Sequence, residues 1–135
     1  MSAVEASTDR LVLTAPHTTA SLATVRIFAG AAARDRLSSE SVEDLKLALS
    51  ELCAGGIERT DGPGRIEVEI ALAPDAIDVT CRGVTALASG PAVSANDASR
   101  ARVVEALIPD AAWSVDGDRQ VVRFRLSDEA ATGSV

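Results

Sequence analysis

Aromatic residues are almost absent from this 135-residue sequence, which holds two Phe, one Trp and no Tyr. The core must therefore be aliphatic, built from Val, Leu, Ile and Ala. The sequence also lacks an apolar run near the roughly 18 residues that a membrane span needs. Its first ten residues, MSAVEASTDR, have neither the basic end nor the apolar stretch of a signal peptide. We therefore expect a cytoplasmic protein with no membrane partner.

Cysteine and histidine are also scarce. Cys53 and Cys81 are too few for a disulfide framework, and cytosolic thiols are normally reduced. They are interpreted as buried small hydrophobic residues, with a redox pair as the alternative. His17 is the single histidine and no Cys-x-x-Cys pair is present, so nothing in the sequence resembles a metal site.

Positive charge is outweighed by negative charge. The sequence has 13 Lys and Arg against 20 Asp and Glu, which gives a formal net charge of −7. An acidic surface repels phosphate backbones, and the basic residues are scattered rather than clustered. Direct binding of nucleic acid is therefore not expected. Hydrophobic residues make up 47% and charged residues 24%, as in an ordinary globular chain of one domain.

Strand and helix patterns alternate over residues 10–127, between tails at 1–9 and 128–135 that are expected to be disordered. The periodicity predicts strands at 10–15, 65–72, 76–81, 113–115 and 120–126, and helices at 18–37, 42–59 and 98–108. Ser41 and Asp44 predict a capping box at the second helix, and 84–97 a surface loop. The order β-α-α-β-β-α-β-β predicts an α+β fold, a two-layer sandwich in which three helices cover one face of a mixed, mostly antiparallel sheet.

Four segments of this order resemble a known family. DLKLALSELCAGGIER at 44–59 is similar to that family's second helix, and IDVTCRG at 77–83 to a strand that ends in D-x-G. ASRARVVEAL at 98–107 is similar to G-x-G-L-x-L-V-x-A-L, and QVVRFRL at 120–126 to the last strand. In these segments the chain resembles the GHKL ATPases, specifically the branch of bacterial anti-sigma factors and switch-protein serine kinases. The resemblance spans residues 10–127.

The resemblance also identifies the positions of an ATP site, and most of them are altered. Glu51 matches the glutamate that orients the nucleophile or acts as general base, and Gly83 matches a retained glycine. Gly55 replaces the asparagine that holds magnesium, and Cys81 replaces the aspartate that accepts a hydrogen bond from adenine. Two lid glycines that let the backbone wrap phosphate are replaced by Ala98 and Arg100.

These replacements imply that the chain needs no cofactor. ATP and magnesium would bind only if residual affinity survives, and phosphoryl transfer at a useful rate is not expected. The residues also have ordinary structural interpretations. Glu51 would be a solvated carboxylate, and Gly55 a point of close helix packing. Arg100 would be an exposed arginine near a helix start, or a phosphate contact in place of the missing glycines.

The function implied by the resemblance is regulation by binding other proteins. The hypothesis is an anti-sigma factor, held as a homodimer, that sequesters an alternative sigma factor and is released by a STAS-domain antagonist. In the family, both partners contact the first helix and the nucleotide lid, and the first strand helps to pair protomers. Thr24, Arg26 and the 84–100 loop are therefore the expected partner contacts.

Two other functions remain open. The main alternative is an active serine kinase that phosphorylates the STAS antagonist with Mg-ATP, for which Glu51 and Gly83 are the surviving support. A pseudokinase that regulates an unrelated enzyme is the third possibility.

Overall fold

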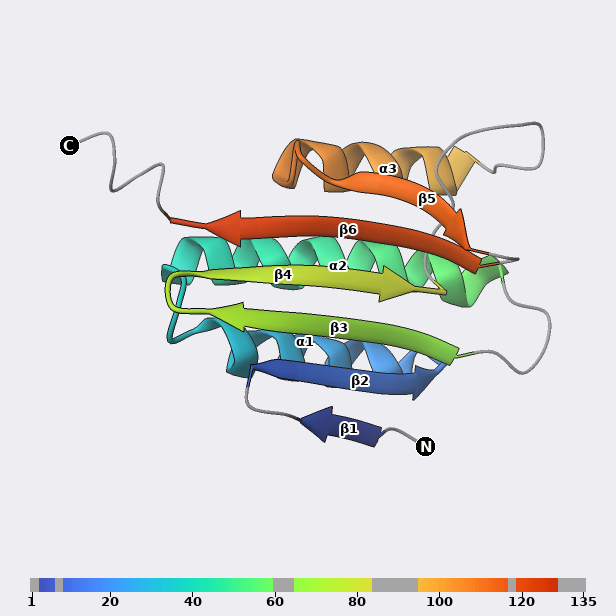
Figure 1. Ribbon diagram of the computed structural model, residues 1–135. Coiled ribbons are helices and arrows are strands. Elements are labelled where there is room, and N and C mark those ends of the chain that lie inside the picture. The colour runs from blue at the N-terminus through green and yellow to red at the C-terminus, as the bar shows by residue number, and fades with distance from the viewer. Residues whose placement is uncertain (1–2, 7–8, 60–64, 84–94, 117–118, 129–135) are drawn as a thin grey trace.

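The fold is α+β, with a six-stranded antiparallel sheet and three helices on one side of it (Figure 1). It is seen in a computed structural model that describes residues 3–6, 9–59, 65–83, 95–116 and 119–128. The elements are β1 (Ala3–Ala6), β2 (Arg10–Pro16), α1 (Ala20–Ala33), α2 (Ser39–Arg59), β3 (Arg65–Ala73), β4 (Ala76–Arg82), α3 (Ala95–Leu107), β5 (Ala112–Asp116) and β6 (Arg119–Ser127). Among the helices described, none is long and apolar enough to cross a membrane.

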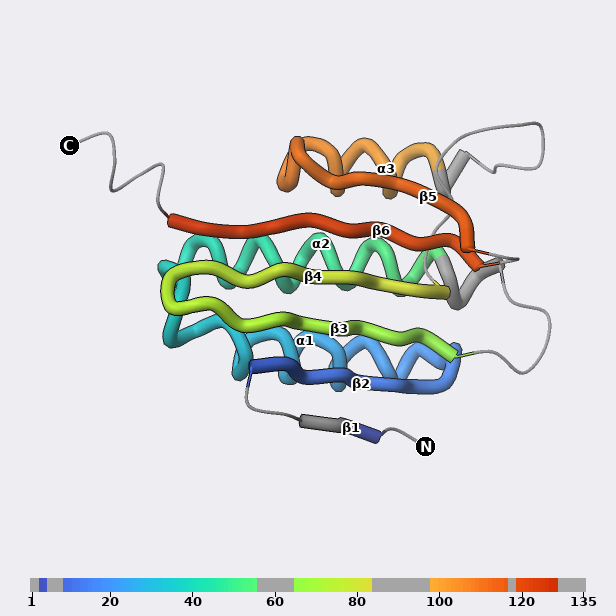
Figure 2. The backbone as a smooth tube through the Cα atoms, viewed as in Figure 1, coloured from blue at the N-terminus to red at the C-terminus, as the bar shows by residue number. Residues whose placement is uncertain are grey.

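The sheet has the order β1-β2-β3-β4-β6-β5, and each neighbouring pair among the described strands is antiparallel. The expectation of a mixed sheet was therefore wrong. When a single helix connects two neighbouring strands, the second strand runs parallel to the first. Here α1 and α2 both lie between β2 and β3, so the chain reverses once more and β3 runs antiparallel to β2 (Figure 2). β4 and β5 share a direction, but β6 separates them.

The N-terminal segment also differs from the prediction. Residues 1–9 were expected to be a disordered tail, whereas Ala3–Ala6 form β1, which pairs with β2. Four residues are too short for a strand pattern to stand out from a composition rich in Ala, Ser and Thr. β1 occupies the outer edge of β2, the strand that the sequence predicted as the first. β2 therefore has neighbours on both sides, and β1 forms this edge of the sheet.

The start of α2 is capped differently from the prediction. The helix begins at Ser39, and Ser38 accepts a hydrogen bond from the Ser41 backbone N–H through its Oγ (3.2 Å). The carboxylate of Asp128 completes this cap, because it accepts from the Ser38 backbone N–H and from Ser41 Oγ (2.8 Å for the latter). A negative charge at a helix N-terminus is favourable. The predicted capping box of Ser41 and Asp44 was therefore wrong, since the cap lies three residues earlier, at Ser38. Asp128 was expected in the disordered tail 128–135, but it belongs to the folded domain.

The core lies between the sheet and the helices and is aliphatic, as the composition predicts. Buried Leu, Ile, Val and Ala side chains dominate it, and Phe124 is the one fully or nearly buried aromatic residue in the described part. In β3 the alternation predicted from sequence is confirmed: Ile66, Val68 and Ile70 are buried against the helices. The other face is polar, and there Glu69 pairs with Arg10 on β2 at 2.7 Å.

Candidate functional site

The candidate site lies between α2 and α3. Glu51 projects from the middle of α2, and Arg100 projects from the second turn of α3. Arg100 Nη1 donates to Glu51 Oε2 at 3.2 Å, and both side chains are half-buried. A hollow of about 230 Å³ opens beside them and is also lined by Ser99 and Val103. The structure therefore brings together two of the residues that the sequence singled out, as an ion pair between two helices.

The remaining positions on the two helices offer no ligand. Gly55 lies one turn after Glu51, where it is buried and has no side chain. Ala98 is half-buried inside α3, which begins at Ala95, three residues before the predicted start. Ala98 and Arg100 therefore lie in a regular helix and not at its first residues. Of the loop expected to contact partners, 84–94 lies outside the described residues.

Cys81 lies on strand β4, in the core between the sheet and the helices. It is fully buried on β4, and Cys53 is fully buried on α2. Burial raises the pKa of Cys53 from 9.0 to about 12. The pKa of Cys81 is raised well above its ordinary value, mainly by burial and also by Cys53, while Arg82 opposes the shift. A thiol held neutral in an apolar core is a poor replacement for a carboxylate that accepts a hydrogen bond.

The buried thiols predict both low reactivity and loss of stability at high pH. Well below pH 9 both states of the protein keep these thiols protonated, so they add no pH dependence. Between about pH 9 and pH 12 the unfolded chain loses these protons while the folded chain keeps them, so the free energy of unfolding should fall as pH rises. Urea unfolding at several pH values measures this fall.

The control for the thiol prediction is a Cys53→Ala, Cys81→Ala double variant, whose stability should fall less between pH 9 and pH 11. Ellman's reagent should label neither thiol in the native protein, and both after unfolding. Rapid labelling at neutral pH without denaturant would contradict the burial of the two side chains.

Gly83 lies at a junction of four strand ends. It directly follows β4 and has a φ of 74°, which an L side chain rarely adopts. Its N–H donates to the Gln120 carbonyl at 3.0 Å, and its own carbonyl accepts from His17 Nε2 at 2.9 Å. A Cβ at this position would stand 2.5 Å from the Arg65 carbonyl oxygen. The glycine retained in the sequence therefore has a structural reason to be there.

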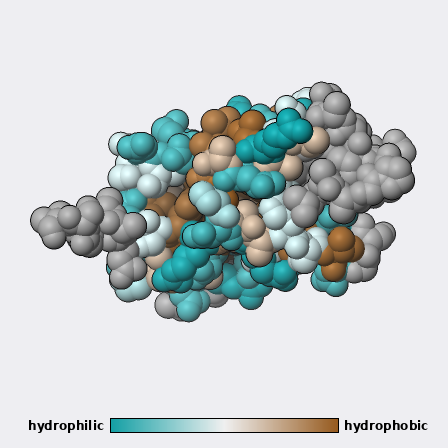
Figure 3. Space-filling view, turned by 90° about the horizontal axis from the view of Figure 1, so that it is seen from above, coloured by the Kyte–Doolittle hydropathy of each residue, from teal (hydrophilic) through white to brown (hydrophobic). Residues whose placement is uncertain are grey.

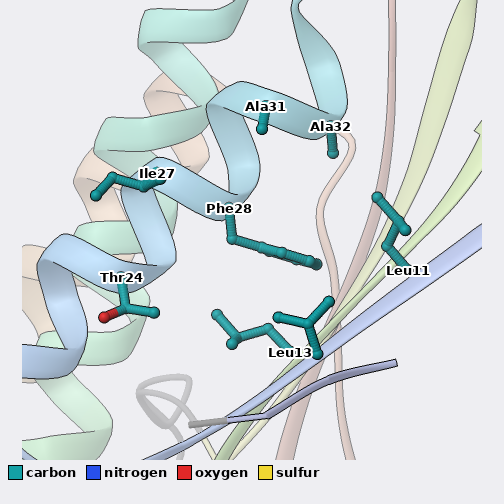
Figure 4. A pocket seen from close by; sticks show the side chains of 8 residues that line it. Leu11, Leu13, Thr24, Ile27, Phe28, Ala31 and Ala32 are labelled. Atoms are coloured by element: carbon teal, nitrogen blue, oxygen red, sulfur yellow. The ribbon is translucent and has the colours of Figure 1, made fainter. Parts of the chain in front are cut away.

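Two residues expected to contact partners lie on different sides of α1. Thr24 lines a hollow of about 420 Å³ between α1 and strands β1 and β2, into which Phe28 projects toward Leu11 and Leu13 (Figure 4). Arg26 is exposed and lines another hollow, between α1 and α2. Ile27 lies between them and borders both hollows. Thr24 and Arg26 therefore do not share one hollow.

The described residues that the resemblance assigns to an ATP site do not supply the ligands expected for magnesium and adenine. Across the described part of the chain, no group of three or more His, Cys, Asp and Glu side chains lies close enough together to hold a metal ion. The glutamate that matches the catalytic position is engaged by Arg100. The positions that the resemblance would assign to the metal and to adenine are occupied by Gly55 and by the buried thiol of Cys81.

Other residues of the region were not identified from the sequence. His17 had no distinguishing pattern, yet it joins the end of β2 to Gly83. Leu47 and Ile27 are apolar but exposed by 47% and 73%. Their position on the outer faces of α2 and α1 could have been found from helical spacing, since each falls opposite the buried residues of its own helix.

Comparison with known proteins adds no relative. No family model matches the sequence, and no curated protein is significantly similar to it. The function must therefore be inferred from the chain's own residues.

Proposed function

We propose that this chain is an anti-sigma regulatory factor, a binding protein that sequesters an alternative sigma factor and is released by a STAS-domain antagonist. It works as a cytoplasmic homodimer and without kinase activity. The fold expected from the resemblance to the GHKL family agrees with the observed layers at a coarse level, a sheet with helices on one face.

The ion pair between Glu51 and Arg100 is the main observation that supports a binding protein and not a kinase. A general base needs a free carboxylate within reach of the proton that it removes. Here the carboxylate is engaged by a guanidinium 3.2 Å away, which comes from a position where the family has a phosphate-binding glycine. The same contact ties α3 to α2 across the hollow that a nucleotide would have to enter.

Exposed residues of α1 support the binding function. Arg26 and Ile27 lie on the surface of α1, and Ile27 is exposed by 73%. An exposed large apolar side chain with an arginine beside it is typical of a protein interaction surface. Blocking a sigma factor by covering its surface requires no turnover, so an altered ATP site is compatible with this function.

The test uses purified alternative sigma factors and STAS-domain proteins encoded in the same genome. One sigma factor should bind, and a STAS protein should displace it. Arg26→Glu should weaken that binding by about threefold to tenfold, because a rim charge turns from attractive to repulsive. Arg34→Glu is the matched control, since Arg34 is equally an exposed arginine but lies at the far end of α1. Calorimetric titrations measure both affinities.

Two results would contradict the proposal. If none of these proteins binds, the anti-sigma assignment is wrong. If Mg-ATP binds with micromolar affinity and Glu51→Gln abolishes phosphorylation of a STAS protein, the chain is the serine kinase instead.

A further inference from the structure

The outer seam between α1 and α2 holds a hollow of about 890 Å³. The two helices run antiparallel because the short segment 34–38 joins them, and they pack side by side on the sheet (Figure 2). The hollow faces away from the sheet. Its lining therefore belongs to the surface of the helix layer and not to the core.

The middle of the seam is apolar. Ile27 from α1 and Leu47 from α2 both line the hollow, and they are exposed by 73% and 47%. Figure 4 shows Ile27 pointing away from Leu11 and Leu13, which form the floor of the sheet-facing hollow. Ala23, one turn before Ile27, adds a small apolar side chain to the lining. Adjacent exposed apolar side chains of this kind mark interaction sites.

Two contacts fix the order of residues along the seam. Arg26 Nη1 donates to Ser50 Oγ at 3.3 Å. A Cβ on Gly30 would stand 2.8 Å from Lys46 Cε, so Gly30 lies against Lys46. Moving along α1 from Arg26 to Gly30 therefore corresponds to moving along α2 from Ser50 toward Asp44. Six residues of helix separate Ser50 from Asp44, a distance of about 9 Å.

The two ends of the seam carry opposite charges that have no ionic partner among the described residues. Arg26 contacts only the neutral hydroxyl of Ser50, and Asp44 makes no ion pair within the part of the chain that the structure describes. The other charges of the seam are engaged, since Lys46 pairs with Glu43 at 3.1 Å and Glu51 pairs with Arg100. The seam therefore has an unpaired positive end and an unpaired negative end, with an apolar middle.

We infer that this seam is the docking groove for an amphipathic helix of a partner protein. The helix would place apolar side chains, spaced by three or four residues, on Ile27 and Leu47. It would place an acidic residue at Arg26 and a basic residue about two turns away, at Asp44. The order of these two charges along the partner fixes the direction in which its helix runs. The inference assigns the partner-binding surface of the proposed anti-sigma factor, and to that extent it rests on the proposed function.

The apolar part is tested with a fluorescein-labelled, hydrocarbon-stapled peptide of 18 residues, with a leucine stripe and a Glu and a Lys two turns apart. Fluorescence anisotropy should show saturable binding. Ile27→Glu and Leu47→Glu should each weaken it by at least about tenfold, since each removes buried apolar contact. Val115→Glu is the matched control: this valine of β5 is exposed by 61% and does not line the seam. Figure 3 views the molecule from above Figure 1, on the side where α3 and β5 lie.

The charged ends are tested by exchanging them. Arg26→Glu or Asp44→Lys alone should weaken binding by about fivefold, the upper range for an exposed ion pair that becomes repulsive. The double variant should regain the original affinity within about twofold, because the peptide binds in the reverse direction. A spin label at one end of the peptide broadens NMR signals at one end of the seam in the original protein, near Ser50 or near position 44. In the double variant it should broaden the signals at the other end.

Several results would overturn the inference. These are no saturable binding of the peptide, equal weakening by Val115→Glu, or additive losses in the double variant. Circular dichroism of each variant shows whether it is folded. If Ile27→Glu instead abolishes self-association of the chain, the seam is covered by a second copy and the inference is wrong. The peptide assay needs no sigma factor, so its failure is distinct from failure of the proposed function.

Discussion

Replacing Gly83 by alanine is expected to lower the free energy of unfolding by about 2–4 kcal/mol. Two effects add in this substitution. Its φ of 74° disfavours any residue with a Cβ, and that Cβ would stand 2.5 Å from the Arg65 carbonyl oxygen. Because the obstructing atom belongs to the backbone of β3, it cannot rotate away. Relief of the clash would separate the ends of β3 and β4 and weaken the hydrogen bond from His17.

Gly30→Ala is the matched control for this substitution. A Cβ on Gly30 would also meet an atom closely, Lys46 Cε at 2.8 Å, but that atom is near the end of a flexible side chain. Gly30 lies inside α1, where alanine favours the helix by about 0.5–1 kcal/mol. Its substitution should be neutral or stabilising in urea unfolding. Equal stability of both variants would contradict the strand junction described for Gly83.

Leu49→Ala should lower the free energy of unfolding by about 2–5 kcal/mol, since it removes a large side chain from the core and leaves a cavity. Leu49 is fully buried on α2 and belongs to the hydrophobic core. The loss should appear as a lower midpoint of urea unfolding with little change in slope.

Leu47→Ala is the control for Leu49→Ala: it is the same substitution two residues earlier on the same helix, at a leucine that is exposed by 47%. Its substitution should change the free energy of unfolding by less than about 0.5 kcal/mol. It should nevertheless weaken binding of the stapled peptide. A large loss of stability in Leu47→Ala would mean that the orientation of α2 is wrong.

Elements that bury one face could be predicted from the sequence. β3 and α2 were placed within a few residues, because Ile66, Val68 and Ile70 alternate strictly and the leucines of α2 recur at helical spacing. β1 could not be predicted, because its stability comes from pairing with β2 and not from a pattern of its own. The fully antiparallel sheet could not be predicted, because β4 and β5 flank the single helix α3 and share a direction, and only the position of β6 between them prevents a parallel pair.

The candidate site was predicted only in part. Family-like spacing selected Glu51 and Arg100 separately, but nothing in the sequence indicated that residues 49 positions apart form an ion pair. The same is true of His17, whose contact with Gly83 joins segments 66 positions apart. The outer seam required the antiparallel packing of α1 and α2, since the opposite charges of Arg26 and Asp44 become its two ends only in that arrangement.

The cap of α2 by Asp128 bears on how this chain folds during its synthesis. The two partners of this carboxylate, Ser38 and Ser41, are made long before it, at separations of 90 and 87 residues. The first turn of the longest described helix therefore gains its negative cap only after β6 has left the ribosome. Contacts so distant in sequence are made late and slow folding. Until translation passes Asp128, the first turn of α2 should therefore fray in the nascent chain.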